Sequence, residues 1–512
     1  MRATHLAVLL GLLGCGEPRP IAAEADARVR PRAKEGEAPP RPRAGPARLY
    51  SVASRTWIWP TPRVPKGKPG DGASRRFLGY VRVGGSVPLV SSELVQGTNC
   101  RGGFVAVAPR GYVCLDATVT LDASTPFLAN DAATRPAEGA FPYRYALSNG
   151  APMYTRLPTA REARRKEGPL GPAGRFLPLP LFQRGHEALA TLDPIAAVDP
   201  IPDHVARRVT ARERRPLEVL ARTIPHGSML SFTRAFAADG RTWLLSTDLT
   251  LVPADRVREF RRSRFVGTRL GSGVELPIAW ARTRARPRYR RLDDGRFLRS
   301  EQDWQPRSFE ALTGREEARD GRRYLETRAL DGAWLDAADA TVVTRREERP
   351  RGVRPGEKWL VVSITQGTLV AYDDATPVYA TLISPGQGGV PRRGGDHVRD
   401  STTPLGSYRI TFKDRASTMS PNTDGTPDDE ARRFWIADVP FTQYFSAPFA
   451  IHASYWHESF GEPMSAGCIN ASPSDAEWLF DWTGPSVPEG WQGATGAAAP
   501  ENGGATWVIV TR

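Results

Sequence analysis

The sequence contains 512 residues, of which 40% are hydrophobic, and it carries a formal net charge of +14. This length and apolar content suffice for several folded domains. Arginine supplies most of the positive charge, but it is spread along almost the whole chain, and no recognition helix or base-stacking motif accompanies it. The composition therefore argues against a nucleic-acid partner and is compatible with an anionic cell wall.

The N-terminus combines a charged start with a short apolar run over residues 6–13. This arrangement is typical of a secretory signal peptide, here residues 1–14, and the run is too short to span a membrane. Residues 12–15, Leu-Leu-Gly-Cys, resemble a bacterial lipobox, which implies that Cys15 becomes the lipidated first residue of the mature protein. The alternative is an ordinary cleaved signal with a coincidental cysteine. We expect an exported, membrane-anchored lipoprotein that faces the periplasm or cell wall. Because Gly16 follows the cysteine, we expect the anchor in the outer membrane.

A tether is predicted next, over residues 15–48, which are rich in Pro, Ala and Arg and have little to bury. Such a composition favours a disordered, partly polyproline-like chain. At about 3 Å per residue it could span up to about 90 Å, which would let an anchored protein reach the wall.

Short β-type runs between turn signals characterise residues 49–122. The runs cover 55–59, 77–83, 103–107 and 111–115. They predict a small β-barrel similar to the bacterial SH3-like type. Cys100 and Cys114 flank one predicted hairpin, and in an exported protein two such cysteines favour a disulfide over a metal pair.

An internal repeat follows this module. Its first copy contains Pro142, Tyr145, Ala146, Pro152, Tyr154, Arg156 and Leu157, and its second contains Pro277, Trp280, Ala281, Pro287, Tyr289, Arg291 and Leu292. The constant spacing predicts two further SH3-like modules, residues 140–260 and 275–345. The first is expected to be interrupted by an insertion at about 158–225.

The last predicted domain covers residues 357–512, where β-type runs begin at Lys358 and end near the C-terminus. Gln366-Gly367 lies between two apolar runs and predicts a hairpin. A polar stretch rich in Pro, Asp and Thr, between residues 413 and 433, lacks periodicity and predicts a lid over the substrate.

Cys468 and His452 are the candidate nucleophile and general base of this domain. The small residues Ser465, Ala466 and Gly467 precede the thiol and let backbone amides approach it, as an oxyanion-binding turn requires. His452 ends an apolar run, so its imidazole is expected at a strand end beside the cysteine. An imidazole that takes the thiol proton makes cysteine a competent nucleophile. From these residues alone, an inert buried cysteine and a structural histidine remain alternatives.

The sequence of residues 452–470 resembles the catalytic segment of the YkuD-type L,D-transpeptidases. That segment has a His, a gap, Ser-His-Gly-Cys, an apolar residue and then Arg or Asn. The matching residues are His452, Ser465, Gly467, Cys468, Ile469 and Asn470. Ala466 departs from the usual His of the family, and Ala453 departs from the Gly that commonly follows the base. The resemblance continues in 403–406, Thr-Pro-Leu-Gly, and in 472–475, Ser-Pro-Ser-Asp, which predicts a capped helix start.

The resemblance implies a mainly β fold, in which SH3-like modules precede a YkuD-type, β-sandwich-like catalytic domain with a short helix after the cysteine. It implies that Cys468 attacks the third residue of a peptidoglycan tetrapeptide stem, and that His452 is the base, oriented by a backbone carbonyl. Backbone amides near Ala466, Gly467 and Cys468 would hold the oxyanion, and Asn470 would help to fix the loop. No cofactor or metal is expected, and the partners are stem peptides and, through Cys15, the membrane.

The sequence leaves three functions open. Two of them differ in what accepts the acyl group from Cys468, and the third is not catalytic. A transpeptidase would pass it to a diamino-acid side-chain amine, giving a 3-3 cross-link, or to a protein amine. An L,D-carboxypeptidase or amidase would pass it to water with the same motifs. A non-catalytic wall-binding lipoprotein would keep Cys468 as an inert residue.

Overall fold

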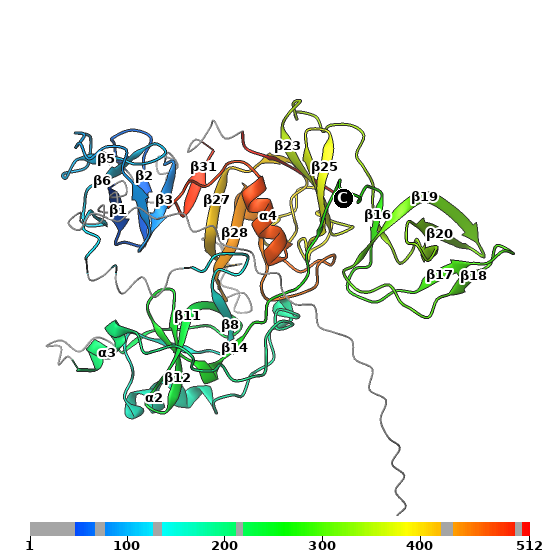
Figure 1. Cartoon of the computed structure of the whole chain (residues 1–512). Helices are drawn as coiled ribbons and strands as arrows, with labels where there is room; N and C mark the ends of the chain where they lie inside the picture. The colour runs from blue at the N-terminus through cyan, green and yellow to red at the C-terminus, as the bar shows by residue number, and fades with distance from the viewer. Residues whose placement is uncertain are drawn as a thin grey trace, which may run out of the picture. The chain divides into compact units, whose positions relative to one another are not determined.

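The computed structural model describes residues 47–66, 77–125, 128, 136–210, 219–420, 434–496 and 504–512. Strands dominate these residues and the helices are short (Figure 1), which confirms the predicted mainly β fold. Within these ranges, no helix is both long and apolar enough to cross a bilayer. The predicted signal peptide, Cys15 and nearly all of the predicted tether lie outside the described residues.

The first region consists of short paired strands. They are β1 (Arg48–Ser51), β2 (Arg55–Ile58), β3 (Gly79–Arg82), β4 (Ser86–Pro88), β5 (Phe104–Ala106), β6 (Tyr112–Cys114) and β7 (Val119–Thr120). β1 lies between β4 and β7, β2 pairs with β3, and β5 forms a hairpin with β6. A disulfide joins Cys100 to Cys114. The four runs named from the sequence coincide with β2, β3, β5 and β6, while the SH3-like character of the module stays a prediction.

Two further regions contain equivalent sets of strands. The first set is β8 (Arg144–Ser148), β9 (Pro152–Tyr154), β10 (Leu220–Thr223), β11 (Met229–Ala238), β12 (Arg241–Ser246), β13 (Leu251–Pro253) and β14 (Val257–Glu259). The second set is β16 (Ile278–Trp280), β17 (Arg288–Arg291), β18 (Phe297–Arg299), β19 (Phe309–Arg319), β20 (Arg322–Thr327), β21 (Ala333–Asp336) and β22 (Thr341–Val343).

The two sets follow one pairing pattern. β8 pairs with β11 and β14, as β16 pairs with β19 and β22. β9 pairs with β10 and β13, as β17 pairs with β18 and β21. The hairpins β11–β12 and β19–β20 and the next pairs, β12–β13 and β20–β21, complete the correspondence. This duplication agrees with the repeat read from the sequence.

The connection between β9 and β10 is long, whereas the equivalent connection between β17 and β18 is a short turn over 292–296. The long connection carries α2 (Ala160–Glu167), the 3-10 turns η3 (Gly168–Leu170) and η4 (Leu181–Gln183), and α3 (Asp203–Thr210). Thr159 caps α2 in a capping box with Glu162, which satisfies amides at the start of the helix. We call residues 155–219 the β9–β10 connection; it corresponds to the predicted insertion.

The C-terminal domain contains a sheet in the order β15-β25-β24-β23-β32-β26. These strands are β15 (Thr268–Arg269), β23 (Lys358–Ser363), β24 (Thr368–Asp373), β25 (Thr376–Leu382), β26 (Gly406–Arg409) and β32 (Trp507–Thr511). Gln366-Gly367 lies in the turn of the β23–β24 hairpin, as predicted, and Gly367 has a φ of 65° that favours glycine.

The remaining strands of this domain belong to a second, larger sheet. They are β27 (Phe412–Met419), β28 (Ile436–Ser446), β29 (Phe449–Ala453), β30 (Ile469–Ala471) and β31 (Gly493–Thr495). The helix α4 (Pro473–Trp482) begins at the predicted cap, where the Ser472 side chain accepts the amide of Asp475. Apolar residues of both sheets and α4 form one buried cluster.

The prediction of a lid over residues 413–433 is wrong for its first part. Residues 413–419 belong to β27, which pairs with β28 along its length. Lys413 is fully buried, and its Nζ donates to the carbonyl of Thr483 at 2.9 Å. The polar composition misled the prediction because buried partners satisfy these side chains. Residues 421–433 lie outside the described residues.

Two of the preceding regions join the second sheet of the C-terminal domain through strand pairing and through the buried carboxylates of Asp414, which accepts from Tyr80 at 2.8 Å, and Asp438. β3 pairs with β31, and β11 pairs with β28. In β28, buried Asp438 accepts hydrogen bonds from Ser231 at 2.5 Å, Thr247 at 2.6 Å and Arg82 at 3.1 Å. One side chain therefore links three regions that are distant in sequence.

Candidate active site

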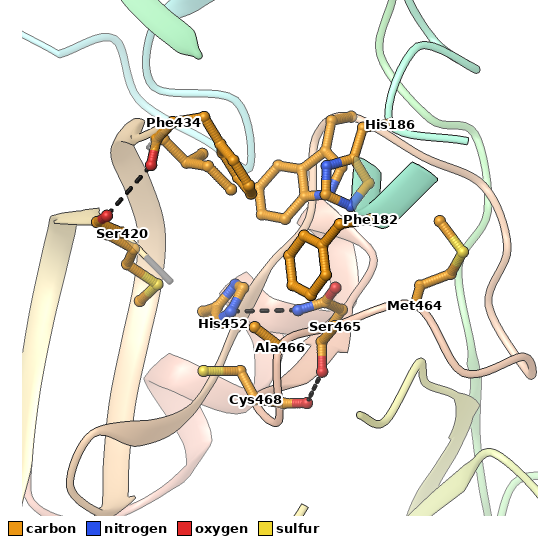
Figure 2. Close-up of a pocket in the computed structure, with 13 residues that line it drawn as sticks. Phe182, His186, Ser420, Phe434, His452, Met464, Ser465, Ala466 and Cys468 are labelled. Carbon is orange, nitrogen blue, oxygen red and sulfur yellow. Dashed lines mark hydrogen bonds between the residues drawn. The ribbon is translucent and has the colours of Figure 1, made fainter. Parts of the chain in front are cut away.

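The parallel pairing of β29 and β30 brings the candidate base and nucleophile into one place. His452 lies opposite Asn470 in the register of the two strands. Cys468 directly precedes β30, and the backbone of Ala450 in β29 hydrogen-bonds its thiol. The intervening residues form the crossover that a parallel pair requires. Figure 2 shows Cys468 and His452 close together at one side of a pocket.

A directed series of hydrogen bonds fixes the His452 imidazole. Its Nδ1 lies 3.0 Å from the carbonyl oxygen of Ala453, so this nitrogen carries the proton. Its Nε2 accepts an N–H of the Asn470 amide at 3.2 Å. The Oδ1 of Asn470 lies 3.1 Å from Nε2 of His457, whose Nδ1 accepts the amide of Ser459 at 3.1 Å. These contacts define every donor and acceptor, and they leave Nε2 as the basic nitrogen of His452.

Burial keeps both reactive groups neutral near pH 7. Desolvation raises the pKa of the Cys468 thiol to about 11, against a smaller lowering by the backbone of Ala450. Desolvation also lowers the pKa of His452 to about 4, against a smaller raising by its bond to Ala453. The resting site therefore holds a thiol and a neutral imidazole, and the thiol proton must move when the sulfur attacks.

The turn before the cysteine requires glycine and is closed by a serine. Gly467 has a φ of 119°, and an added Cβ would lie 2.5 Å from the Phe449 ring and 2.9 Å from the Thr402 carbonyl. Ser465 Oγ donates to the Cys468 carbonyl at 2.5 Å and accepts the Gly467 amide at 3.0 Å. The Gly467 amide is thus engaged within the turn.

A neighbouring segment holds the same turn from outside. The amides of Met464 and Ser465 donate to the Pro385 carbonyl at 2.9 and 3.1 Å, and the amide of Gln387 donates to the Ser465 carbonyl at 2.9 Å. Thr403, from the predicted Thr-Pro-Leu-Gly motif, accepts the amide of Gly386 at 2.9 Å. This motif therefore supports the segment that positions the cysteine turn.

The pocket around Cys468 has a volume of about 90 Å³. Its wall includes side chains from the β9–β10 connection as well as from the catalytic domain. The lining residues are Phe182, His186, Met419, Ser420, Phe434, Ile436, His452, Trp456, Met464, Ser465, Ala466, Cys468 and Asn470. Sequence reasoning missed Phe182 and His186 because no local motif joins them to the cysteine. His457 lies outside the resembled motif, and its side chain is fully buried behind Asn470.

The other cysteines have separate positions. Cys100 and Cys114 are bridged in the first region, Cys15 lies outside the described residues, and Cys468 is the free cysteine of the described part of the chain. In that part, no group of three or more His, Cys, Asp or Glu side chains is placed to hold a metal ion.

Comparisons with known proteins point to one family. A family model described as the L,D-transpeptidase catalytic domain, YkuD, matches residues 357–506. A probable L,D-transpeptidase 3 from Mycobacterium tuberculosis is 31% identical over 81 residues, which are 15% of this chain and 30% of that protein. The chain thus spans less than a third of the length of this curated relative.

Solved structures give matches of low sequence identity. An L,D-transpeptidase from Xylanimonas cellulosilytica is 20% identical, with 32% of this chain and 65% of that chain covered and a TM-score of 0.21. The structure of L,D-transpeptidase 3 from M. tuberculosis in complex with a faropenem-derived adduct is also 20% identical, with 40% of this chain and 79% of that chain covered and a TM-score of 0.23.

The range matched by the family model runs from β23 to just past β31 and contains His452, Cys468 and Asn470. It is the range in which the sequence resembles the same family. Residues 357–506 therefore form a YkuD-type L,D-transpeptidase catalytic domain.

Proposed function

We propose that this chain is a peptidoglycan L,D-transpeptidase that forms a thioester acyl-enzyme on Cys468. One observation carries the proposal: the pocket holds a free thiol beside an imidazole whose hydrogen bonds leave Nε2 as its basic nitrogen. This pairing is the arrangement that cysteine acyl transfer requires. The substrates follow from the family of residues 357–506.

In the acylation step, the Asn470 amide turns away from His452, whose Nε2 takes the thiol proton. The sulfur of Cys468 attacks the carbonyl of the third stem residue and forms a tetrahedral intermediate. The amides of Ala466 and Cys468 are the proposed oxyanion donors, since the Gly467 amide is engaged by Ser465. The carbon–nitrogen bond then breaks, His452 returns its proton to the leaving amine, and D-alanine departs from the thioester.

In the second step, a diamino-acid side-chain amine of another stem attacks the thioester carbonyl. His452 takes a proton from the amine, and the carbon–sulfur bond breaks. The proton returns to the sulfur, which restores the neutral thiol. Water in place of the amine would give a shortened stem, and a protein amine would give a protein attached to the wall.

Mass spectrometry of the purified chain with a tetrapeptide stem tests the acyl-enzyme. We expect a covalent adduct on Cys468 and a cross-linked product when a second stem is present. A carbapenem, a ligand class of the resembled family, should also acylate this residue. Cys468→Ser keeps the size of the side chain and should lose both adducts. A folded chain whose Cys468 takes no adduct would support the wall-binding alternative, and shortened stems alone would support the hydrolase.

His452→Ala tests the base separately from the nucleophile. It should slow acylation severely while leaving the thiol open to alkylation. Because burial raises the pKa of Cys468 to about 11, high pH should rescue the variant only near that value. A rate that does not change on loss of the imidazole would contradict the assignment.

We further propose that Cys15 is lipidated, which places the catalytic domain at the end of a membrane tether. The support is the Leu-Leu-Gly-Cys run at residues 12–15. Cys15→Ser should release the chain from the membrane fraction of the producing cells. Quantitative retention of that variant in membranes would refute the anchor.

A further inference from the structure

His457 is a buried histidine of the catalytic domain that takes no part in the proposed proton transfers. Its side chain is fully buried, and its ring centroid lies 5.2 Å from that of Phe460. It does not line the pocket, so a bound substrate does not contact it. Any effect of His457 on the reaction must therefore pass through its hydrogen bonds, which lead to Asn470 and from there to His452.

Backbone groups at both ends give these hydrogen bonds a single direction. At one end, the amide of Ser459 can only donate, and it donates to Nδ1 of His457 at 3.1 Å. In a neutral ring, the proton then lies on Nε2, which faces Oδ1 of Asn470 at 3.1 Å. At the other end, the carbonyl of Ala453 can only accept, so it fixes the proton of His452 on Nδ1. The lone pair of His452 Nε2 therefore faces the NH2 group of Asn470.

The Asn470 amide could adopt a second orientation within this series. Its backbone is fixed, because its N–H and C=O pair with the backbone of Ser384 at 2.9 and 2.8 Å. The side-chain amide could still turn end over end, which would place Oδ1 against His452 and the NH2 group against His457. The second contact would bring two donors together, since His457 Nε2 carries a proton. His457 therefore selects the orientation marked in Figure 2, in which an amide N–H donates to His452.

The selected orientation opposes protonation of His452. A proton on Nε2 would point at the Asn470 N–H, whereas the inverted amide would offer that proton an oxygen. A hydrogen bond to the neutral form of a group disfavours its charged form, so the Asn470 bond acts in the same direction as desolvation. Desolvation is the largest cause of the lowered pKa of His452, about 4. The base therefore stays free to accept the thiol proton even in mildly acidic solution.

The ionisable neighbours of the two imidazoles are Cys468, His186 of the β9–β10 connection and Glu458. Burial raises the pKa of the Cys468 thiol and lowers that of the His186 imidazole, so both are neutral near pH 7. Glu458 raises the pKa of His457, but desolvation outweighs it and lowers this pKa to about 4. The Glu458 carboxylate pairs with two arginines, Arg261 at 3.2 Å and Arg307 at 3.4 Å. His457 is therefore neutral near pH 7, as the direction of the hydrogen bonds requires.

We propose that His457 is a positioning residue, which holds the Asn470 amide in the orientation that keeps Nε2 of His452 free to accept the thiol proton. The movement of Asn470 during acylation is then a displacement without inversion of the amide. The same hydrogen bonds re-form once His452 has passed its proton on. This inference rests on the proposed transpeptidase function, but it concerns the proton affinity of the base, which can be measured without a substrate.

The first test is the acid limb of the pH profile of kcat/KM for acylation by a tetrapeptide stem, which reports the base of the free enzyme. His457→Phe keeps a ring against Phe460 but removes the donor to Asn470, so the amide can turn its oxygen towards His452. The pKa of His452 should then rise from about 4 to about 6. Acylation should fall about tenfold at about pH 5 and stay within about twofold at about pH 8.

Two further variants separate the hydrogen bond from the bulk of the side chain. His457→Gln has an amide that can replace both ring nitrogens, so it should restore acylation at about pH 5. His457→Leu repeats the loss of the donor with a smaller side chain, in case phenylalanine prevents folding. His226→Phe is the matched control, because His226 bonds the Pro178 carbonyl and does not line the pocket.

Nitrogen NMR titration of the histidine rings gives a readout that does not depend on activity. The His452 signal is assigned by its loss in His452→Ala, and its titration should move to higher pH in His457→Phe and return in His457→Gln. Equal losses of acylation at both pH values, or an unchanged His452 titration, would make His457 a structural residue and overturn the inference. A chain that forms no stem adduct but shows the expected titrations would support the role of His457 and refute only the proposed function.

Discussion

The two equivalent strand sets, β8–β14 and β16–β22, share every pairing among their own strands but differ strongly in one connection. In the second set, β17 and β18 are joined by a tight turn over residues 292–296. In the first set, the β9–β10 connection carries helices and reaches the catalytic pocket with Phe182 and His186. The comparison shows that the strand pairing does not need the long connection, although Leu189, Ile195 and Val205 of this connection are buried in the core.

The two strand sets also differ in their ion pairs, which are buried in the first set and near the surface in the second. In the first, buried Glu167 of α2 accepts hydrogen bonds from Arg241 at 2.7 and 2.8 Å, from Arg256 at 3.1 Å and from Tyr154 at 2.9 Å. In the second, Glu317 pairs with Arg291 near the surface, where ion pairs contribute little. A buried cluster therefore fastens the connection to its own sheet, and the second set has no connection to fasten.

Exchanging the connections should have the largest effect. We expect the chain in which residues 292–296 replace the β9–β10 connection to keep its strand pairing, because the second set closes with this turn, but to be less stable, because Arg241 and Arg256 lose Glu167. Stem acylation should fall by about a thousandfold, or about 4 kcal/mol of barrier, since the wall of the pocket is lost. Alkylation of Cys468 by a small reagent should persist or quicken. Near-normal stem turnover would show that the wall has no role.

The buried cluster around Glu167 predicts that two Glu→Gln substitutions, one in each strand set, differ greatly in their effect on stability. Glu167→Gln leaves Arg241 and Arg256 without their carboxylate and should lower the free energy of unfolding by about 3 kcal/mol. Glu317→Gln should give no measurable change. Denaturant unfolding monitored in both variants checks this. Equal effects would mean that the connection is not held by Glu167.

The same carboxylate gives a pH dependence with a definite sign. Desolvation raises the pKa of Glu167, but the hydrogen bonds and charges of Arg241 outweigh it, and the net result is a pKa below the ordinary 4.5. The folded state therefore holds its proton more weakly than the unfolded chain does. The resulting stability is present above about pH 4.5 and is lost as pH falls through the folded-state pKa. Glu167→Gln should lose this acid sensitivity.

Titration of the Cys468 thiol should show directly, through a smaller effect, how far the β9–β10 connection shields the sulfur from water. In the unaltered chain, the alkylation rate of Cys468 should rise with pH until about 11, the pKa that burial imposes. In the exchanged chain, water reaches the sulfur, and the apparent pKa should move down towards the ordinary 9.0. An unchanged titration would show that the catalytic domain alone buries the Cys468 thiol.

Local sequence signals predicted the catalytic strands better than the walls of the site. His452 lies in β29 and Cys468 directly precedes the adjoining β30. Short apolar runs, a glycine turn and a helix cap, together with the family resemblance, pointed to both. His186 reaches the pocket through a connection far away in sequence, and the pairing of β11 with β28 and the hydrogen bonds of Asp438 join its region to the catalytic domain. No local motif identified His457, because its hydrogen bond to Asn470 depends on the folded arrangement of the two residues. The misassigned lid shows the same limit, since the partners that bury Lys413 are distant in the chain.

The smallest expected effect concerns Ala466, which stands where the resembled family has a histidine. Ala466→His should change stem turnover within roughly tenfold, or about 1.4 kcal/mol of barrier, because His452 is the proton acceptor. Stem kinetics of this variant and of the unaltered chain measure the difference. A gain of several orders of magnitude would show that the native site lacks a group that the histidine of the resembled family supplies.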